Sequence, residues 1–517
     1  MLLQIKNLTL IHRRDDRVLM KDFSYSLNPG DRAALIGEEG DGKSTLLKLI
    51  YDEALVSDYA EYTGEIVKSG RFGYLAQELS EDGTRQSVFE FCSQVSSFSS
   101  LSPAELSAAA FRLGLNPGLF WSDRAVDTLS GGEKVKLQLA RILMDRPDAL
   151  LLDEPSNDLD LETLEWLEAF LNTCGLPVLY VSHDETLLGR TANVVIHLEQ
   201  VRRKTLPRHT VARMPYRQYV EERLAKFTHQ EQVARKERSE YEKQQEKFRQ
   251  IQSKVEHDQA SVSRSDPHGG RLLKKKMKSV KSMGRRFERE HAESTRIPDT
   301  EDAILVRFGD GISVPNGKTV LDLDLKELEA GNRILAKNLC LHVAGPEKLC
   351  IIGRNGAGKT TLLRKIAENL LARQDVKSAY MPQNYGELLN GAVTPVEFLS
   401  AAGSREETTR IRTFLGSVKY TAEEMEHGVA ELSGGQQAKL LFLKMIFNGC
   451  NVLVLDEPTR NFSPLSNPVL RDVLRSYQGA IISVSHDRKY IAEVCTRVLR
   501  LTETGLLPVS GALTNGK

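Results

Sequence analysis

The chain lacks several features that mark particular classes of protein. Its six cysteines (Cys92, Cys174, Cys340, Cys350, Cys450 and Cys495) are scattered and form no Cys-x-x-Cys pair, which argues against a disulfide framework or a zinc site. No segment approaches the roughly 18 to 20 consecutive apolar residues of a membrane helix. The N-terminus lacks the basic start, long apolar stretch and small-residue cleavage site of a signal peptide. A net charge of zero, from 70 basic and 70 acidic residues, excludes a protein that is basic throughout.

What remains is an ordinary globular composition in a long chain. Hydrophobic residues make up 40% and charged residues 27% of the 517 residues. At roughly 150 residues per domain, this length predicts two to four domains. We therefore expect a soluble, cytoplasmic, multidomain protein with reduced thiols and no membrane domain of its own.

An internal repeat is the most informative feature of the sequence. Residues 37–44 (GEEGDGKS) and 353–360 (GRNGAGKT) both match the phosphate-binding pattern GxxxxGK[ST], known as Walker A. Each match follows a short apolar stretch and precedes a helical one. Glycines let backbone N–H groups surround a phosphate, and a helix N-terminus adds partial positive charge. Lys43 and Lys359 would face the β- and γ-phosphates, and Ser44 and Thr360 would offer hydroxyls to Mg²⁺.

Four further motifs recur in the same order in both halves. They are a glutamine after a short strand (Gln77, Gln383), an LSGG sequence (129–132, 432–435), an apolar run ending in Asp-Glu-Pro (150–155, 452–458) and a Val-Ser-His-Asp sequence (181–184, 484–487). In both halves 23 residues separate the LSGG serine from the aspartate, and 30 residues separate that aspartate from the histidine. Coincidence does not reproduce five motifs, their order and their spacing twice.

Together these motifs resemble the ATPase domains of ABC-type proteins. The resemblance implies an α/β fold with two tandem ABC-type P-loop ATPase domains, at residues 1–206 and 301–517. It also implies that the halves stack head to tail, so that ATP lies between the Walker A loop of one half and the LSGG loop of the other. One chain would then form both sites internally, and we expect a monomer.

The resemblance assigns roles residue by residue. Glu154 and Glu457 would polarise the attacking water as general bases, and His183 and His486 would contact the γ-phosphate. Mg²⁺, the expected cofactor, would be held by Ser44, Gln77 and Asp153 in one half and by Thr360, Gln383 and Asp456 in the other. The residues expected to bind ATP are Gly37, Gly40, Gly42, Lys43, Ser44, Thr45, Gln77, Ser130, Gly131, Gly132, Gly353, Gly356, Gly358, Lys359, Thr360, Thr361, Gln383, Ser433, Gly434 and Gly435.

The two halves depart from the pattern in different places. The first phosphate loop carries Glu38, Glu39 and Asp41, an acidic set for an anion site that we expect to be tolerated but to weaken affinity. After Asp-Glu-Pro, the first half continues SNDLD (156–160), whereas the second continues TRNFS (459–463) and lacks both acidic positions. The two sites are therefore not expected to be equivalent. His12 is the best candidate in the first half for a ring that stacks on adenine.

The segment between the halves, residues 207–300, has a different composition. Apolar or aromatic residues recur every seven positions from Val220 to Val255, and a second helical pattern runs from Leu273 to His291. A turn-rich break between them predicts a long antiparallel helical hairpin with an apical loop near 253–270. About 40 helical residues would reach about 60 Å.

The second helical pattern is strongly basic. Ten basic and two acidic residues lie between Arg264 and Arg289, whereas most solvated helices alternate in sign. Self-repulsion within such a run is relieved by a polyanion, so we predict contact with nucleic acid. The residues expected to contact the nucleic acid are Arg264, Arg271, Lys274, Lys275, Lys276, Lys278, Lys281, Arg285 and Arg286.

Two ABC-type halves with a basic helical linker and no membrane domain resemble the ABC-F family. That family implies a ribosome-associated protein whose linker reaches from the tRNA exit site toward 23S rRNA near the peptidyl-transferase centre of the 70S ribosome. The segment from Lys43 to Gln77 exceeds its counterpart in the second half by about ten residues, so the "arm" of the family would be short. A short arm, a long linker and the divergent 38–39 and 459–464 segments resemble the branch that confers antibiotic resistance. A translation factor for stalled ribosomes, the motor of an efflux transporter and a DNA-repair ATPase are the alternatives.

Overall fold

The computed structural model describes residues 2–79, 81–201, 206–261, 267–292, 312–331, 333–389, 391, 393–401 and 403–509. The chain divides into two compact units. One comprises Met1–Tyr216 together with Glu301–Lys517, and the other is Arg217–Thr300. The first unit therefore contains both sets of repeated motifs, and the second contains the basic segment.

The central sheet of the first half has six strands in the order β5 (Phe72–Leu75), β6 (Ala149–Asp153), β7 (Val178–Val181), β3 (Arg32–Ile36), β8 (Val194–Gln200) and β9 (Leu206–Ala212). All neighbours are parallel except β8 and β9. Strands β3, β6 and β7 are almost entirely buried, as expected for parallel strands covered on both faces. Their C-terminal ends share one edge of the sheet, which is where ligands bind in open α/β folds.

The second half repeats this arrangement. Its sheet has the order β13 (Ser378–Met381), β14 (Val452–Asp456), β15 (Ala480–Val484), β12 (Lys348–Ile352), β16 (Arg497–Thr502) and β17 (Gly505–Pro508), again parallel except for the last pair. The matching strand orders show that the sequence repeat is a structural duplication. Two tandem ABC-type α/β halves and a helical hairpin, the fold class expected from the sequence, are confirmed.

Corresponding helices follow the repeated motifs. In the first half they are α1 (Lys43–Tyr51), α5 (Gly131–Met144), α6 (Leu161–Thr173) and α7 (Glu185–Thr191). In the second half they are α11 (Lys359–Leu371), α14 (Gly434–Phe447), α15 (Asn467–Ser476) and α16 (Arg488–Val494). Further helices lie between the glutamine and the LSGG sequence of each half: α2 (Glu81–Arg85), α3 (Val88–Ser93) and α4 (Pro103–Leu113), and then α12 (Pro395–Leu399) and α13 (Arg405–Ser417).

A small antiparallel sheet accompanies each half and differs between them. The first consists of β2 (Arg17–Leu27), β1 (Leu3–His12) and β4 (Ala60–Lys68), and the second of β10 (Thr319–Ala330) and β11 (Arg333–Ala344). The extra residues between Lys43 and Gln77 include β4, which pairs with β1 along most of its length. The excess therefore builds an additional strand of a sheet, and the segment expected to be a short arm is not a helical projection.

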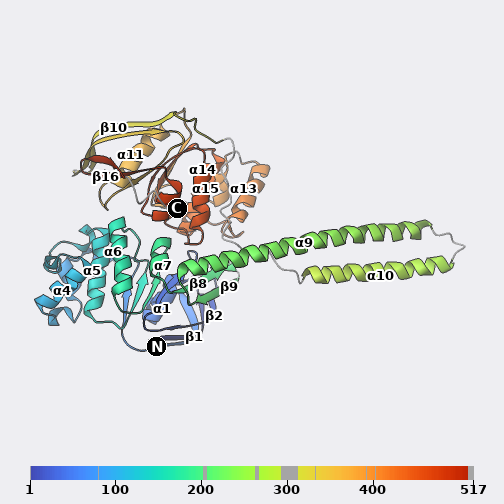
Figure 1. Ribbon diagram of the computed structural model, residues 1–517, viewed down its shortest axis with the longest axis horizontal. Coiled ribbons are helices and arrows are strands. Elements are labelled where there is room, and N and C mark those ends of the chain that lie inside the picture. Colours follow the sequence, from blue (N-terminus) through green and yellow to red (C-terminus); the bar gives the residue numbers. More distant parts are fainter. Residues whose placement is uncertain are drawn as a thin grey trace. The chain divides into compact units, whose positions relative to one another are not determined.

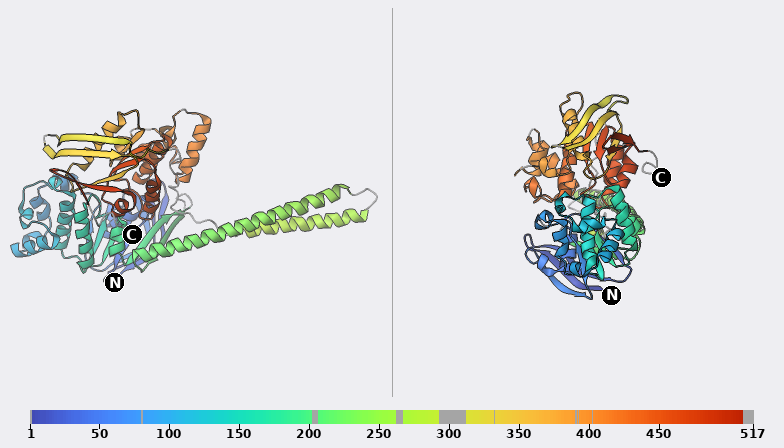
Figure 2. Two further views of the ribbon diagram at one scale, coloured as in Figure 1. Left: turned by 45° about the horizontal axis from the view of Figure 1, so that its top comes forward. Right: turned by 90° about the vertical axis from the view of Figure 1, so that its left-hand side faces the viewer.

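Helices α9 (Tyr216–Ser261) and α10 (Pro267–Ala292) form the hairpin and lie side by side (Figures 1 and 2). Their seam includes Ala234, Val255 and Val280, which are less than 9% exposed. At Gly284, an added Cβ would lie 2.8 Å from the Phe248 ring, so a larger residue here would require that ring to shift. At 1.5 Å per residue, the 46 residues of α9 span about 70 Å.

The boundaries of the hairpin differ from those expected from the sequence. Strand β9 extends the first sheet to Ala212, so residues 207–212 pair with β8 rather than belonging to the linker. Helix α9 continues to Ser261 and α10 begins at Pro267, so most of the segment expected to be an apical loop is helical; residues 262–266 lie outside the described residues. Proline lacks an N–H donor that the first turn of a helix does not use, which explains why Pro267 begins α10.

Candidate active site

The phosphate loops connect β3 to α1 and β12 to α11. Gly42 and Gly358 cap these helices with φ of 87° and 94°, a conformation that strains other residues. The Lys43 ammonium donates to the carbonyls of Gly37 (2.9 Å) and Glu38 (2.7 Å), and the Lys359 ammonium donates to those of Gly353 and Arg354 (both 2.9 Å). Both lysines are over 90% buried. Each loop thus wraps around its own lysine, as a phosphate cradle requires.

The expected magnesium ligands lie together in the first half. The Ser44 hydroxyl donates to Oδ1 of Asp153 over 2.9 Å, so a hydroxyl and a carboxylate, both hard oxygen ligands, face one point. Burial raises the pKa of Asp153 to about 6, although the Ser44 hydrogen bond opposes the rise. In the second half Asp456 is 1% exposed, and burial raises its pKa against the neighbouring Thr360 hydroxyl and Lys359 ammonium. These oxygens fit Mg²⁺, which prefers carboxylate and hydroxyl ligands combined with substrate phosphates.

Both glutamines line the cavity described below, together with Ser44. The Gln383 amide donates to the Asp158 carboxylate of the first half over 3.1 Å, although the sequence predicted it to be a metal ligand. In this structure Gln383 therefore connects the two halves.

Glu154 and His183 form a close pair in the first half. The Nε2 atom of His183 lies 3.3 Å from Oε1 of Glu154, and its Nδ1–H donates to the Phe462 carbonyl of the second half over 2.9 Å. Burial alone would raise the pKa of Glu154, but the adjacent His183 and Lys43 outweigh it and lower that pKa to about 2. The carboxylate of Glu154 is therefore ionised, the state a general base requires.

The equivalent pair in the second half is electrostatically different. The His486 Nε2 lies 3.8 Å from Glu457, which instead accepts a hydrogen bond from the His486 backbone N–H (3.2 Å). Burial and the neighbouring Asp456 raise the pKa of Glu457 to about 8. Burial and the charge of Lys359 lower the pKa of His486 to about 4. Glu154 and Glu457 lie in the same sequence motif, but their pKa values are shifted in opposite directions. The two halves are therefore inequivalent at these residues too.

Each phosphate loop faces the LSGG loop of the opposite half. In one direction the carboxylate of Glu39 accepts the Gly435 backbone N–H over 2.6 Å. In the other direction Asn355 donates to the Asp158 carbonyl, and an added Cβ on Gly131 would lie 3.5 Å from the Asn355 amide nitrogen. A cavity of about 930 Å³ lies between the halves and is lined by both of them, including Lys43, Ser44, Glu154, Thr360 and Gly434.

The LSGG residues begin helices. Ser130 and Ser433 cap α5 and α14. In return, the side chains of Glu133 and Gln436 accept a hydrogen bond from the backbone N–H of the capping serine. An added Cβ would approach the Asp158 carbonyl to 2.6 Å at Gly131 and the Asn461 carbonyl to 2.8 Å at Gly435. The glycines therefore let the start of each helix pack closely against the segment that follows the Asp-Glu-Pro sequence of the same half, and in α14 the Gly435 N–H already holds an anion, the Glu39 carboxylate.

Several residues that the motifs did not assign connect the halves. Asp158 accepts hydrogen bonds from Gln383 and from Arg460, whose guanidinium lies 2.9 Å away. The sequence analysis noted that segments 156–160 and 459–463 differ in charge. It did not predict that the two segments contact each other. His12, the candidate for adenine stacking, lies 2.7 Å from the Asp15 carboxylate.

The predicted RNA-contacting residues lie on α10. All that the structure describes (Arg271, Lys274, Lys275, Lys276, Lys278, Lys281, Arg285 and Arg286) are exposed, and Arg264 lies outside the described residues. Among the described residues, no helix is both long and apolar enough to cross a bilayer.

Comparison with known proteins agrees with this geometry. The family model described as ABC transporter matches residues 20–157 and 336–460, which together cover just over half of the chain and contain both sets of phosphate-loop, LSGG and Asp-Glu residues. The chain belongs to the ABC transporter family. As a member with both complete ATP-binding halves, it is an ATPase.

Relatives that align with nearly all of this ABC ATPase are named as ATP-binding proteins or as F family members. The putative ATP-binding protein YdiF of Bacillus subtilis is 28% identical, covering 98% of this chain and 80% of that protein. ABC transporter F family member 5 of Arabidopsis thaliana is 26% identical (95% and 74%). ATP-binding cassette sub-family F member 3 of Homo sapiens is 27% identical (96% and 71%). Among solved structures, the archaeal ribosome recycling factor aABCE1 in complex with the stalk protein aP1 matches with a TM-score of 0.60 and 17% identity (98% and 90%), a likeness of fold.

Proposed function

We propose that this ABC ATPase belongs to the ABC-F group, binds the 70S ribosome and confers antibiotic resistance by displacing drugs from the large subunit. Its two ATPase halves, its helical hairpin and its relatives named as F family members support this assignment. The hairpin, at residues 217–300, separates the ATPase halves at 1–216 and 301–517. The protein acts as a monomer in the cytoplasm.

The basic face of α10 carries the proposal. Nine described lysine and arginine side chains on this helix are exposed, within a chain of zero net charge. An ATPase cycle does not require such a helix, whereas a polyanion such as 23S rRNA neutralises it and releases counterions. The reach of α9, about 70 Å, is long enough to carry the tip of the hairpin far from its base. We assign the hairpin to the region between the tRNA exit site and the peptidyl-transferase centre.

The ATP sites drive the cycle. Lys43 and Lys359 hold the phosphates, and the LSGG glycines of the opposite half complete each site, so ATP favours closure. Ser44 with Asp153, and Thr360 with Asp456, would hold Mg²⁺, which would neutralise charge on the phosphates. Glu154 and Glu457 orient the attacking water, while His183 and His486 lie beside them to contact the γ-phosphate. Hydrolysis then opens the halves and releases the protein from the ribosome.

A sedimentation experiment tests the ribosomal role. The Glu154→Gln/Glu457→Gln variant, which keeps ATP but cannot activate water, should comigrate with 70S ribosomes in sucrose gradients in the presence of ATP. The same variant with ADP is the matched control and should remain at the top of the gradient. Migration with membrane vesicles instead of ribosomes would favour the motor of an efflux transporter.

A translation experiment separates drug displacement from rescue of stalled ribosomes. The parent protein should restore cell-free translation that is blocked by a drug bound near the peptidyl-transferase centre. A variant shortened between residues 259 and 269 should lose this effect while keeping its ATPase activity, because the change lies in the other compact unit. If the parent rescues only drug-free stalled ribosomes, the translation-factor function replaces the proposed one.

A further inference from the structure

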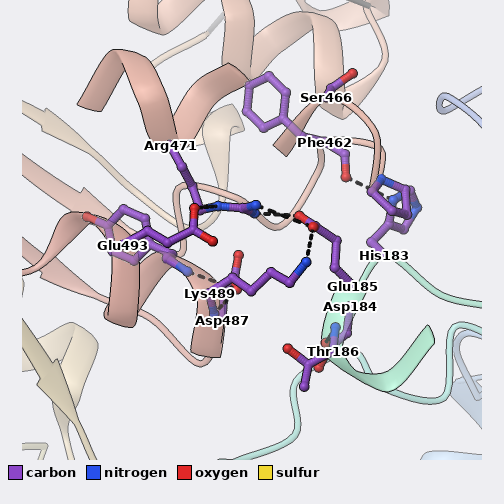
Figure 3. Close-up of polar contacts among 12 residues, drawn as sticks. His183, Asp184, Glu185, Thr186, Phe462, Ser466, Arg471, Asp487, Lys489 and Glu493 are labelled. Carbon is purple, nitrogen blue, oxygen red and sulfur yellow. Dashed lines mark hydrogen bonds and ion pairs between the residues drawn. The ribbon is translucent and has the colours of Figure 1, made fainter. Parts of the chain in front are cut away.

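The two histidine segments meet at a buried ion cluster that none of the repeated motifs includes. Glu185 begins α7 of the first half, and Arg471 lies on α15 of the second; they are 7% and 3% exposed. The guanidinium of Arg471 donates to both carboxylate oxygens of Glu185 and, through Nε, to Glu493 over 2.7 Å. The Lys489 ammonium on α16 donates to Glu185 over 2.7 Å. Figure 3 shows Arg471 and Lys489 pointing at Glu185 from the second half.

This cluster is joined rigidly to both histidines. Asp184 follows His183 and caps α7 by accepting the backbone N–H groups of Thr186 and Leu187. Asp487 follows His486 and caps α16 in the same way. A movement of either histidine segment therefore moves the helix that carries Glu185 or Lys489. His183 is also tied to the second half directly, through the Phe462 carbonyl.

The repeated segments have diverged toward opposite charges at this point. The first half has Asp-Glu after its histidine, whereas the second has Asp-Arg-Lys. Arg488 completes the match, because its guanidinium contacts Glu168 and lies 3.4 Å from Asp184, both in the first half. The oppositely charged residues therefore pair between the two halves. A pair that served only to stabilise one half would lie within that half.

Burial makes these contacts sensitive to how the halves are placed. A buried charge that loses its partner is strongly destabilising, whereas the same charge regains water if the halves separate. Glu185 has its partners only while α7 stays against α15 and α16. The cluster therefore resists small displacements of one histidine segment relative to the other.

We propose that Glu185, Arg471 and Lys489 form a latch that couples the two ATP sites, so that the histidine segment of one site cannot leave its ATP-bound position while the other is held. These are positioning residues, since they act through His183 and His486. The latch rests on the proposed roles of Glu154 and the histidines and is independent of the ribosomal role. It predicts that blocking one site stalls the other.

Site-selective turnover tests the latch. Glu154→Gln blocks the first site, and in the latched protein it should reduce ATP turnover well below half of the parent rate. Adding Glu185→Gln or Lys489→Met should raise the residual turnover about fivefold or more, the size of a typical coupling between sites. Lys489 is the milder change, because its side chain is 40% exposed and Glu185 keeps Arg471 as a partner. A merely structural role would not increase turnover.

The control is Asp472→Asn, which removes a carboxylate of an exposed pair with Arg475 on the same helix, α15, and should leave the residual rate unchanged. Residual turnover that stays low in folded Glu154→Gln/Lys489→Met would overturn the latch, as would an equal gain from Asp472→Asn. If Glu154→Gln alone leaves more than half of the turnover, the sites are not coupled and the latch is again refuted. Full turnover in Glu154→Gln would instead refute the assignment of Glu154 as a base.

Discussion

Glu39 lies at the LSGG loop of the opposite half, where we propose that a phosphate binds. Its carboxylate accepts the Gly435 N–H over 2.6 Å at the N-terminus of α14, where an anion is favoured by the helix dipole. A hydrogen bond to a charged group contributes about 1.5 to 3 kcal/mol of stabilisation when it is shielded from solvent. Because Glu39 is exposed, we take about 1 kcal/mol. ATP must displace this carboxylate to bind. Glu39→Gln should therefore tighten ATP binding at the first site by roughly fivefold.

The measurement is equilibrium binding of a fluorescent ATP analogue in a Lys359→Ala background, which confines binding to the first site. Glu38→Gln is the matched control, since it removes the same charge from the neighbouring residue, whose carboxylate lies 4.0 Å from Lys439. Tightening in Glu39→Gln but not in Glu38→Gln supports competition at the LSGG loop. Equal affinity in Glu39→Gln and the parent would refute it, and equal tightening in both variants would show a general charge effect.

Three further predictions follow from the same structure. Glu154→Gln together with Glu457→Gln should nearly abolish steady-state ATP hydrolysis while ATP binding persists, because the amide keeps the shape of the base but cannot accept the proton; unchanged hydrolysis would remove both residues from that role. Replacing Lys274, Lys275, Lys276 and Lys278 by Gln should weaken ribosome binding and reduce its log–log salt slope by about 0.7 to 0.9 for each lost phosphate contact; an unchanged slope would indicate a solvated face. Burial raises the pKa of Asp487 to about 6, against the charge of Arg471, so the folded state binds this proton more tightly and the contribution of Asp487 to the stability of the parent falls as pH rises from about 4 to 6. The thermal midpoint of Asp487→Asn should therefore gain on the parent across that window, and a constant difference would contradict the raised pKa.

The local chemistry of the sites could be predicted from the sequence because each motif is confined to a strand end and the following helix. Lys43 wraps into its own loop and Ser44 meets Asp153 because β3 and β6 end at the same edge of one sheet. The duplication, the strand-rich halves and the helical hairpin followed from the spacing of motifs and from heptad periodicity. These features depend on short-range pattern and on the regular order of an α/β sheet.

The contacts between the halves could not be predicted in the same way. Gln383 was expected at a metal but donates to Asp158, and Glu185 meets Arg471 across 286 residues of sequence. Such pairs depend on which surfaces face one another, and no local pattern encodes that. The different pKa values of Glu154 and Glu457 arise within each half: His183 and Lys43 outweigh burial and lower the first, whereas burial and Asp456 raise the second. The shared motif does not show how closely each neighbour approaches the carboxylate.

Displacement of a ribosome-bound drug is the decisive test of the proposed function. Ribosomes loaded with a radiolabelled antibiotic near the peptidyl-transferase centre would be mixed with the Glu154→Gln/Glu457→Gln variant and ATP, and the drug retained on a filter would be counted. We expect this variant to release the label, and the same variant with the shortened hairpin between residues 259 and 269 to leave the label on the ribosome. Retention of the label by ribosomes that have bound the full-length variant would contradict the proposed function.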